Sequence, residues 1–137
     1  MQSDAFLTGG SGLVGGHLLA ALIDRGASVR ALARDDVAAR TVSHHGAIPV
    51  IGDLFDADAL AEGMGGTDVV YHVAGVNEMC SGDRRAMDRV NVDGSLEVIR
   101  AAARAAVRRF VYTSSAAVIG ESEGVVGTEQ TVHSGEY

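Results

Sequence analysis

Cysteine and proline are almost missing from this sequence of 137 residues, which has one of each and no tryptophan. Because Cys80 has no second cysteine to pair with, no disulfide can form within the chain, and the cytoplasm is the expected compartment. The sequence also lacks an apolar run near the roughly 18 residues that a membrane helix needs. It begins without the charged and apolar regions of a signal peptide. We therefore expect neither a membrane span nor secretion.

Positive charge is scarce as well. Eleven Lys and Arg residues stand against 18 Asp and Glu, which gives a formal net charge of −7. The basic residues concentrate only at Arg104, Arg108 and Arg109, so nucleic acid is not an expected partner. His44 and His45 are adjacent and cannot share one face of a helix or strand, and no other spacing is typical of a metal site. No metal is expected.

Apolar residues make up 47% of the chain, which is enough for one core in one domain. They form short strand-like runs that alternate with helix-like patterns. Such alternation predicts an α/β fold, a doubly wound parallel sheet of the Rossmann type with five or more strands in an order beginning 3-2-1-4-5. We expect strands at 5–7, 29–32, 48–51, 68–73 and 110–113, and helices at 13–25, 35–42, 56–62 and 84–106.

The single proline lies inside the third expected strand, 48–51. Proline cannot donate a hydrogen bond to a neighbouring strand, so this strand is expected at an edge of the sheet. One long helix is expected over roughly 84–106, and the segment 121–136 is expected to be a surface loop. The apolar stripe of that helix includes Met87, Val90, Leu96, Ile99 and Ala103.

A glycine-rich segment, Thr8–Gly16, lies between the first expected strand and the first helix. Such a helix start presents unpaired backbone N–H groups and a positive dipole end, which favour a pyrophosphate. Two spacings fit, since Gly10, Gly12 and Gly15 match G-x-G-x-x-G and Gly9, Gly12 and Gly15 match G-x-x-G-x-x-G. In the second, Gly9 makes the tight turn, Gly12 lets phosphates approach and Gly15 seats the helix on the sheet. The segment predicts dinucleotide binding, and a plain strand-to-helix turn is the alternative.

Residues beyond the carboxyl ends of the other strands are further candidates, because ligands of such sheets bind there. Ala33 stands where an acidic residue would accept hydrogen bonds from the adenosine ribose of NAD, and Arg34 follows. Arginine can pair with the 2′-phosphate of NADP, so NADP is the expected cofactor and NAD the alternative, unless Arg34 is only a solvated surface residue. Asp53 can accept from the adenine amino group or can simply cap a helix.

Five motifs in order resemble the extended short-chain dehydrogenase/reductase family, especially its NAD(P)-dependent epimerase/dehydratase and dihydroflavonol-reductase-like members. They are Thr8–Gly15, Gly52–Leu54, Val70–Ala74, Asn91–Gly94 and Phe110–Val118. The resemblance implies that Thr8 and Asn91 tie the cofactor loop to the central helix, and that Ser115 is catalytic together with a tyrosine of a Tyr-x-x-x-Lys motif. The complete set of cofactor-binding candidates is Thr8, Gly9, Gly10, Ser11, Gly12, Leu13, Val14, Gly15, Arg34, Asp53, Leu54, Val73, Ala74, Gly75, Asn91, Thr113 and Ser114.

The resemblance implies an NAD(P)-dependent oxidoreductase or epimerase/dehydratase that acts at a hydroxyl or carbonyl carbon of a small molecule, such as a nucleotide sugar or ketone. Tyr137 is the only tyrosine after Ser115, and the lysine four places on lies beyond the sequence. We therefore expect residues 1–137 to be a dinucleotide-binding domain that lacks the substrate-binding part and is inactive alone, with a homodimer as a further expectation. The alternative is a non-catalytic NAD(P)-binding sensor or interaction protein on the same fold.

Overall fold

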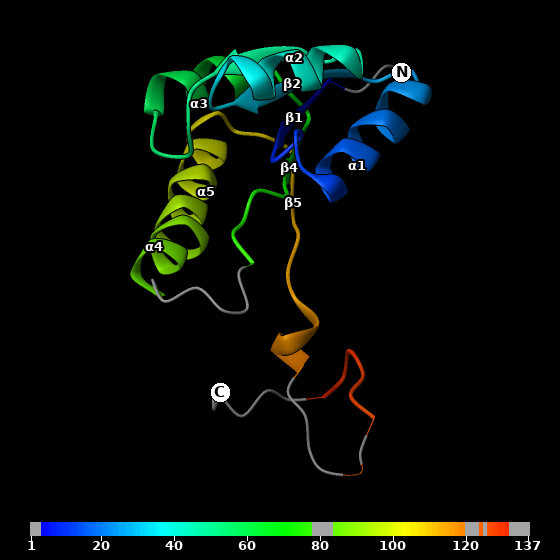
Figure 1. Ribbon diagram of the computed structural model, residues 1–137, viewed down its shortest axis with the longest axis vertical. Helices are drawn as coiled ribbons and strands as arrows, with labels where there is room; N and C mark the ends of the chain where they lie inside the picture. The colour runs from blue at the N-terminus through cyan, green and yellow to red at the C-terminus, as the bar shows by residue number, and fades with distance from the viewer. Residues whose placement is uncertain (1–3, 78–83, 120–123, 125, 132–137) are drawn as a thin grey trace.

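In the computed structural model, which describes residues 4–77, 84–119, 124 and 126–131, five parallel strands form one sheet in the order β3-β2-β1-β4-β5 (Figure 1). This arrangement confirms the predicted fold class and strand order. The strands are β1 (Asp4–Thr8), β2 (Ser28–Ala33), β3 (Ile48–Ile51), β4 (Val69–His72) and β5 (Arg109–Tyr112). The helices are α1 (Leu13–Asp24), α2 (Asp36–His44), α3 (Ala57–Met64), α4 (Arg84–Asp88), the π-helix η1 (Arg89–Gly94), α5 (Ser95–Arg104) and the 3₁₀-helix η2 (Ala116–Ile119).

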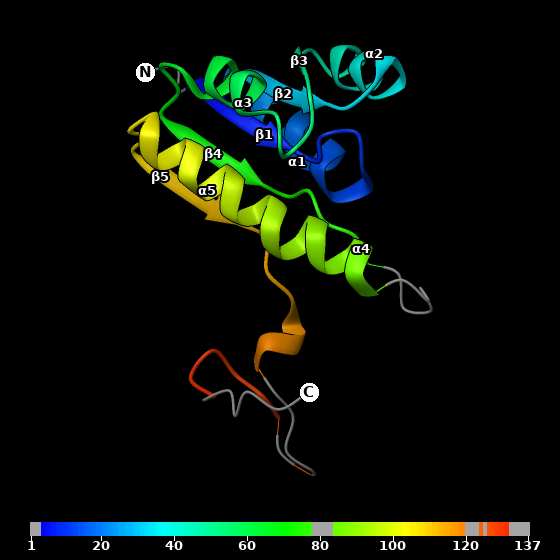
Figure 2. The same cartoon turned by 90° about the vertical axis from the view of Figure 1, so that its left-hand side faces the viewer.

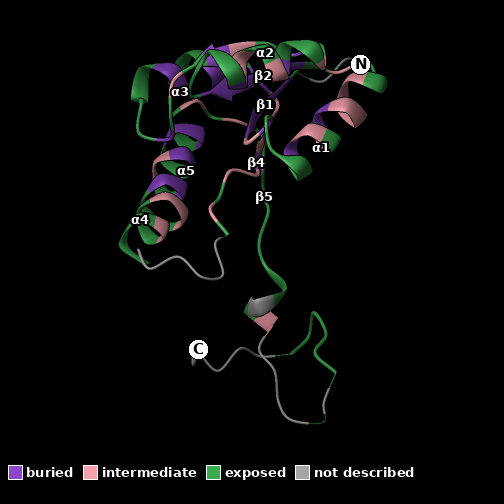
Figure 3. Ribbon diagram, in the orientation of Figure 1, coloured by how far each residue is buried: buried purple, intermediate pink, exposed green. Residues whose placement is uncertain are grey.

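Two apolar cores fill the two faces of the sheet, and Figure 2 shows helices in front of the strands and behind them. Side chains alternate along a strand, so Phe6 of β1 belongs to one core while its neighbours Ala5 and Leu7 belong to the other. Helices α1 and α2 cover the face of Leu7, and helices α3 and α5 cover the face of Phe6. Figure 3 shows β1 and β2 buried between these layers, whereas β5 is largely exposed. The layers leave the carboxyl ends of the strands accessible.

The edge position of Pro49 in β3 is confirmed. The backbone N–H of Gly52 donates to the carbonyl oxygen of Ala33 on β2, with an N–O distance of 3.0 Å. Because backbone groups alternate in direction along a strand, the even-numbered residues of β3 face β2 and Pro49 faces the open edge. Proline at this position costs the sheet no hydrogen bond and removes a donor from an edge that could pair with another chain.

The long helix predicted over roughly 84–106 is found as three contiguous helical segments, α4, the π-helix η1 and α5, which together run from Arg84 to Arg104. Of the expected apolar stripe, Leu96 and Ile99 remain 42% and 44% exposed. A π turn holds about one residue more than an α turn, so the face that follows is rotated relative to regular helical spacing. The face of α5 that packs on the sheet is formed instead by Ser95, Val98, Ala101 and Ala102.

A buried histidine, His72, joins the carboxyl ends of β1 and β4 to the helix that follows. Its Nδ1 lies 2.6 Å from Thr8 Oγ1, and its Nε2 lies 2.9 Å from Ser95 Oγ. Thr8 Oγ1 also accepts the backbone N–H of Ala74 at 3.2 Å, and Ser95 Oγ donates to the carbonyl oxygen of Asn91 at 2.7 Å. His72 is thus a core histidine with a hydrogen-bond partner at each ring nitrogen.

These partners determine which nitrogen of His72 carries the proton. The hydroxyl hydrogen of Ser95 is used on Asn91, so Ser95 Oγ accepts from Nε2–H, and Nδ1 accepts from the hydroxyl of Thr8. A second proton on Nδ1 would face a hydroxyl hydrogen that already points at it. Tyr112 stacks on the imidazole with ring centroids 5.4 Å apart, and Phe110 lies 6.2 Å away. Burial lowers the pKa of His72 to about 4, so the ring is neutral at pH 7.

Acidification should therefore destabilise the fold through His72. The pKa of the ring rises from about 4 in the folded chain to 6.5 in the unfolded chain, so the unfolded state binds the extra proton between these values and stability falls as the pH falls. The full loss is on the order of 3 kcal/mol. Urea unfolding at pH 7 and at pH 4.5 gives the two free energies of unfolding, and their difference measures this loss across most of its range. The His72→Gln variant has no titrating ring and should lose less stability across this window, and equal losses in the two proteins would contradict the assignment.

Candidate functional site

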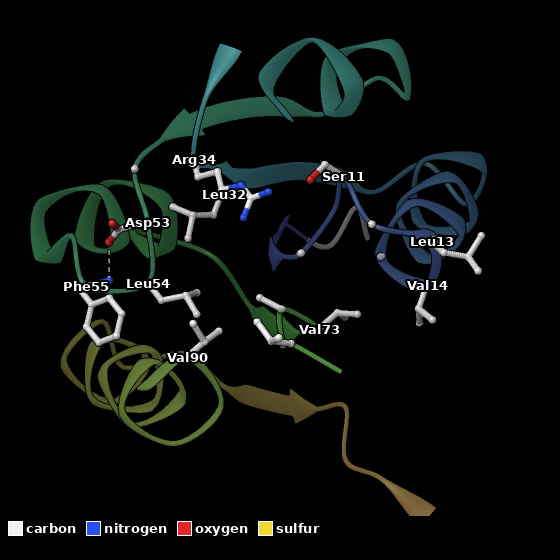
Figure 4. A pocket seen from close by; sticks show the side chains of 17 residues that line it. Ser11, Leu13, Val14, Leu32, Arg34, Asp53, Leu54, Phe55, Val73 and Val90 are labelled. Carbon is white, nitrogen blue, oxygen red and sulfur yellow. Dashed lines mark hydrogen bonds between the residues drawn. The ribbon is translucent and has the colours of Figure 1, made fainter. Parts of the chain in front are cut away.

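A cavity of about 540 Å³ opens beyond the carboxyl ends of the strands, where the strand order reverses between β1 and β4 (Figure 4). Segments that follow β1, β2, β3 and β4 all contribute to its lining, so residues far apart in the sequence meet there. This is the position at which open α/β sheets bind their ligands. The predicted residues that line the cavity are Gly9, Ser11, Gly12, Leu13, Val14, Gly15, Arg34, Asp53, Leu54, Val73, Ala74 and Gly75.

The glycine turn uses the wider of the two predicted spacings. Gly9 has a φ of +76°, and a Cβ there would lie 2.6 Å from the backbone nitrogen of Ala74. A Cβ at Gly15 would collide with the carbonyl oxygen of Gly9, so this glycine lets α1 pack directly on the turn. Gly10, the alternative first glycine, instead faces core side chains of Leu7 and Val42. The turn thus requires glycine at positions 9 and 15 for its own packing.

Gly12 differs from Gly9 and Gly15, because the fold itself has room for a side chain at this position. A Cβ at Gly12 would meet only the carbonyl oxygen of Gly9, at an ordinary contact distance of 3.4 Å. Its φ of −85° is open to any residue. Gly12 lines the cavity at the first residue of the turn into α1. Its missing side chain leaves room on the cavity side, where an approaching ligand would need it.

Helix α1 begins at the cavity without an acidic side chain. Helices α2 and α3 are capped by Asp35 and Asp56, whose carboxylates accept backbone N–H groups at 2.8 and 3.0 Å, and each has a further acid in its first turn. In the described structure of α1, the cap residue Gly12 offers no side chain and the first turn contains no acid. Its first N–H groups and the positive end of its dipole therefore face the cavity, where they could hold a phosphate.

Arg34 lies at the end of β2 and points into the cavity in Figure 4. Its side chain is 83% exposed, and its Nε lies 3.5 Å from Oδ2 of Asp35. The backbone N–H of Ala38, and then the charge of Arg34, hold the pKa of Asp35 below its ordinary value. An exposed pair of this kind contributes little to stability, so the guanidinium can turn to another anion at small cost.

Asp53 lies at the end of β3 and does not cap a helix, so that alternative is wrong. Its Oδ1 accepts the backbone N–H of Phe55 at 2.8 Å, whereas the cap of α3 is Asp56. This short turn places Asp53 and Phe55 on the lining of the cavity, with Leu54 between them (Figure 4). Among the residues that line the cavity, Asp53 is the one with an acidic side chain.

Thr8 and Asn91 do not line the cavity, but both hold a segment that does. Asn91 lies in η1, and its side-chain amide accepts the N–H of Val76 and donates to the carbonyl oxygen of Val76, each at 2.8 Å. Thr8 accepts the N–H of Ala74. The segment after β4 is therefore fixed to β1 by Thr8 and to η1 by Asn91.

Of the two predicted catalytic residues, Ser115 belongs to the part of the chain that the structure describes. Thr113, Ser114 and Ser115 follow β5, are exposed, and are not among the residues that line the cavity. The N–H of Thr113 donates to the carbonyl oxygen of His72, and Ser115 directly precedes η2. Tyr137 and Cys80 lie outside the described residues.

Five residues of the lining were not predicted. Four of them, Gly52, Phe55, Val76 and Val90, directly adjoin predicted positions, and Leu32 lies two residues before Arg34, so a wider window around each predicted residue would have included all five. Val90 comes from η1, so its place on the lining depends on the tertiary packing.

Neither a membrane helix nor a metal cluster is found in the part of the chain that the structure describes. The helices there are too short or too polar to cross a bilayer. Groups of three or more metal-ligating side chains are likewise absent from these residues.

Two proteins of known name are similar to the chain over most of its length. The 4-hydroxy-2-methyl-3-oxo-4-farnesyl-3,4-dihydroquinoline-1-oxide ketoreductase of Stigmatella aurantiaca is 40% identical over 126 residues, which cover 92% of this chain and 37% of the relative. The 3 beta-hydroxysteroid dehydrogenase/Delta 5-->4-isomerase of Mycobacterium tuberculosis is 36% identical over 133 residues, which cover 92% of this chain and 35% of the relative. The chain thus spans little more than a third of the length of either protein.

A solved structure agrees with these similarities. A short-chain dehydrogenase/reductase superfamily protein from Agrobacterium tumefaciens, with bound NAD, superimposes with a TM-score of 0.78 at 33% identity. The match covers 93% of this chain and 38% of that protein. The 3-beta hydroxysteroid dehydrogenase/isomerase family matches residues 6–137. The chain therefore belongs to the 3-beta hydroxysteroid dehydrogenase/isomerase family, in agreement with the extended short-chain dehydrogenase/reductase motifs of its sequence.

Proposed function

We propose that the cavity binds a nicotinamide adenine dinucleotide, and that the chain is the cofactor-binding part of an oxidoreductase. The observation that carries this proposal is the start of α1, where a glycine, free N–H groups and an absence of acidic side chains coincide at the cavity. A pyrophosphate matches these features, because it is an anion that needs several N–H donors and a close approach to the backbone. The NAD bound by the Agrobacterium tumefaciens relative supports the same ligand class here.

The two ends of the cavity suit the two ends of the dinucleotide. With the pyrophosphate at α1, the adenosine would lie toward Asp53 and Leu32, where the carboxylate can accept from the adenine amino group. The nicotinamide would then lie along the segment 73–76, which Thr8 and Asn91 hold in place. Arg34 lies between these ends and favours NADP over NAD, because a guanidinium pairs with a 2′-phosphate.

The reaction that we propose is hydride transfer at a hydroxyl or carbonyl carbon of a small molecule, and an epimerisation or dehydration built on that transfer is the alternative. The dinucleotide supplies or accepts the hydride. Ser115 is proposed to hydrogen-bond the reacting oxygen, and Tyr137 to donate or accept its proton. The names of the two relatives, a ketoreductase and a hydroxysteroid dehydrogenase, favour a ketone or secondary alcohol as the substrate class.

Replacing Arg34 tests the preference for NADP. Loss of one charge-assisted hydrogen bond of about 1.5–3 kcal/mol should weaken NADP binding roughly 10- to 100-fold in Arg34→Ala and leave NAD binding almost unchanged. Calorimetric titration with both nucleotides measures the two dissociation constants. Arg40→Ala removes an exposed cation from α2 that does not line the cavity, and it should change neither. Equal losses for NADP and NAD in Arg34→Ala would contradict the role of this arginine.

Replacing Gly12 tests the position of the pyrophosphate. The fold has room for the Cβ of Gly12→Ala, but that methyl group would occupy the space proposed for phosphate, so both nucleotides should bind at least about tenfold more weakly. Gly16→Ala is the matched control, because its Cβ would meet its nearest atoms only at 3.6 and 3.7 Å. This control should bind normally. Unimpaired binding by Gly12→Ala, with circular dichroism unchanged, would place the pyrophosphate elsewhere.

We also propose a homodimer through the outer face of η1 and α5. Val92, Leu96 and Ile99 recur at helical spacing and are 53%, 42% and 44% exposed. A stripe of this kind favours pairing with the same stripe of a second copy.

Sedimentation equilibrium tests this dimer. Ile99→Glu would bury a charge at the interface and should yield monomers. Val37→Glu replaces an apolar residue on α2 that is 66% exposed, and it should leave the mass unchanged. A wild-type chain that stays monomeric at about 100 μM, a concentration at which a stable interface is occupied, would rule out this dimer.

A further inference from the structure

A cation and an aromatic ring meet at the adenosine end of the cavity. The guanidinium carbon of Arg89, in η1, lies 5.0 Å from the centroid of the Phe55 ring. Phe55 lines the cavity, whereas Arg89 is not among the lining residues. Phe55 as a whole residue is 39% exposed, and its side chain lies beside Leu54 and Val90 in Figure 4. Phe55 thus contacts the cavity, while Arg89 holds the ring from outside it.

The backbone of Phe55 is fixed together with its ring. Its N–H donates to Asp53 Oδ1 at 2.8 Å, so the carboxylate and the ring belong to one short turn. Leu54, between them, is buried and packs against η1, where a Cβ on Gly94 would lie 2.9 Å from Leu54 Cδ1. The π-helix therefore contacts this turn at two residues, through Gly94 at Leu54 and through Arg89 at Phe55.

The groups gathered at this end of the cavity match the chemistry of a purine. An aromatic ring offers a flat face for stacking, and aliphatic side chains of Leu32, Leu54 and Val90 offer apolar contacts. The carboxylate of Asp53 offers an acceptor for an exocyclic amino group. A cation over one face of the ring restricts its rotation and is worth about 0.5–1 kcal/mol at an exposed site.

We propose that Phe55, held in position by Arg89, is the stacking wall of the adenine subsite and determines specificity for adenine nucleotides. This proposal rests on the proposed function, because it presumes that the dinucleotide binds in this cavity. Phe55 touches the base, and Arg89 is a positioning residue that acts through Phe55. Affinity for adenine therefore depends in part on a side chain that touches no nucleotide.

A double-mutant cycle tests both roles. Phe55→Leu keeps the N–H to Asp53 and much of the apolar volume but removes the aromatic face, and it should weaken NADP binding roughly tenfold. Arg89→Met should weaken it about two- to fivefold. Because Arg89 acts through Phe55, the double variant should bind like Phe55→Leu alone. Phe55→Tyr keeps a stacking face and should bind like the wild type.

Arg85→Met is the matched control, since it removes an exposed cation one turn before Arg89 and should change nothing. Two fragments locate the effect: ADP-ribose 2′-phosphate should show the losses, and nicotinamide mononucleotide should not. If the wild type binds no dinucleotide, the proposed function fails. If it binds NADP and Phe55→Leu binds equally well, this inference alone is overturned. If the losses of Arg89→Met and Phe55→Leu add, Arg89 acts on the nucleotide by its charge and the positioning role is wrong.

Discussion

A contact between backbones at the start of α1 determines the form of the whole site. The turn at Gly9 touches the backbone of Ala74 on one side and the helix at Gly15 on the other, so that β1, α1 and the segment after β4 meet without intervening side chains. Any Cβ at either glycine would separate these three elements. The close approach brings the N–H groups of α1 and the segment after β4 onto one cavity at the reversal of strand order. A phosphate site and a wall for the rest of a dinucleotide therefore come from the same packing.

The polar interior of the molecule supports this contact. His72 connects Thr8 and Ser95 in one chain of hydrogen bonds, and Asn91 extends that chain to Val76. Each donor in this chain has an acceptor only if His72 is neutral, which its burial ensures near pH 7. The π-helix η1 contacts two parts of the cavity wall. Its Asn91 binds the segment after β4, and its Arg89 lies over the ring of Phe55. A π turn at this position lets one short helix organise two ends of the cavity.

The sequence predicts those parts of the fold and site that depend on neighbours along the chain. Alternating apolar runs, the position of Pro49 and the glycine spacing predict the sheet, its edge strand and the helix start, because each follows from local backbone chemistry. The inward face of α5 and the lining role of Val90 could not be predicted, since the π turn that rotates them appears only in the packed structure. The sequence allows two interpretations of Asp53, an adenine acceptor or a helix cap, and its hydrogen bond to Phe55 rather than to α3 excludes the cap.

Backbone amide NMR during titration with NADP tests the central claim most directly, because it reports where the nucleotide lies without relying on a variant. We expect the largest shifts on the amides of residues 11–15, which would face the pyrophosphate, and on those of residues 53–55, which would lie beside the adenine. Shifts that spare the start of α1, or that concentrate on the outer face of α5, would contradict the dinucleotide site proposed for this cavity.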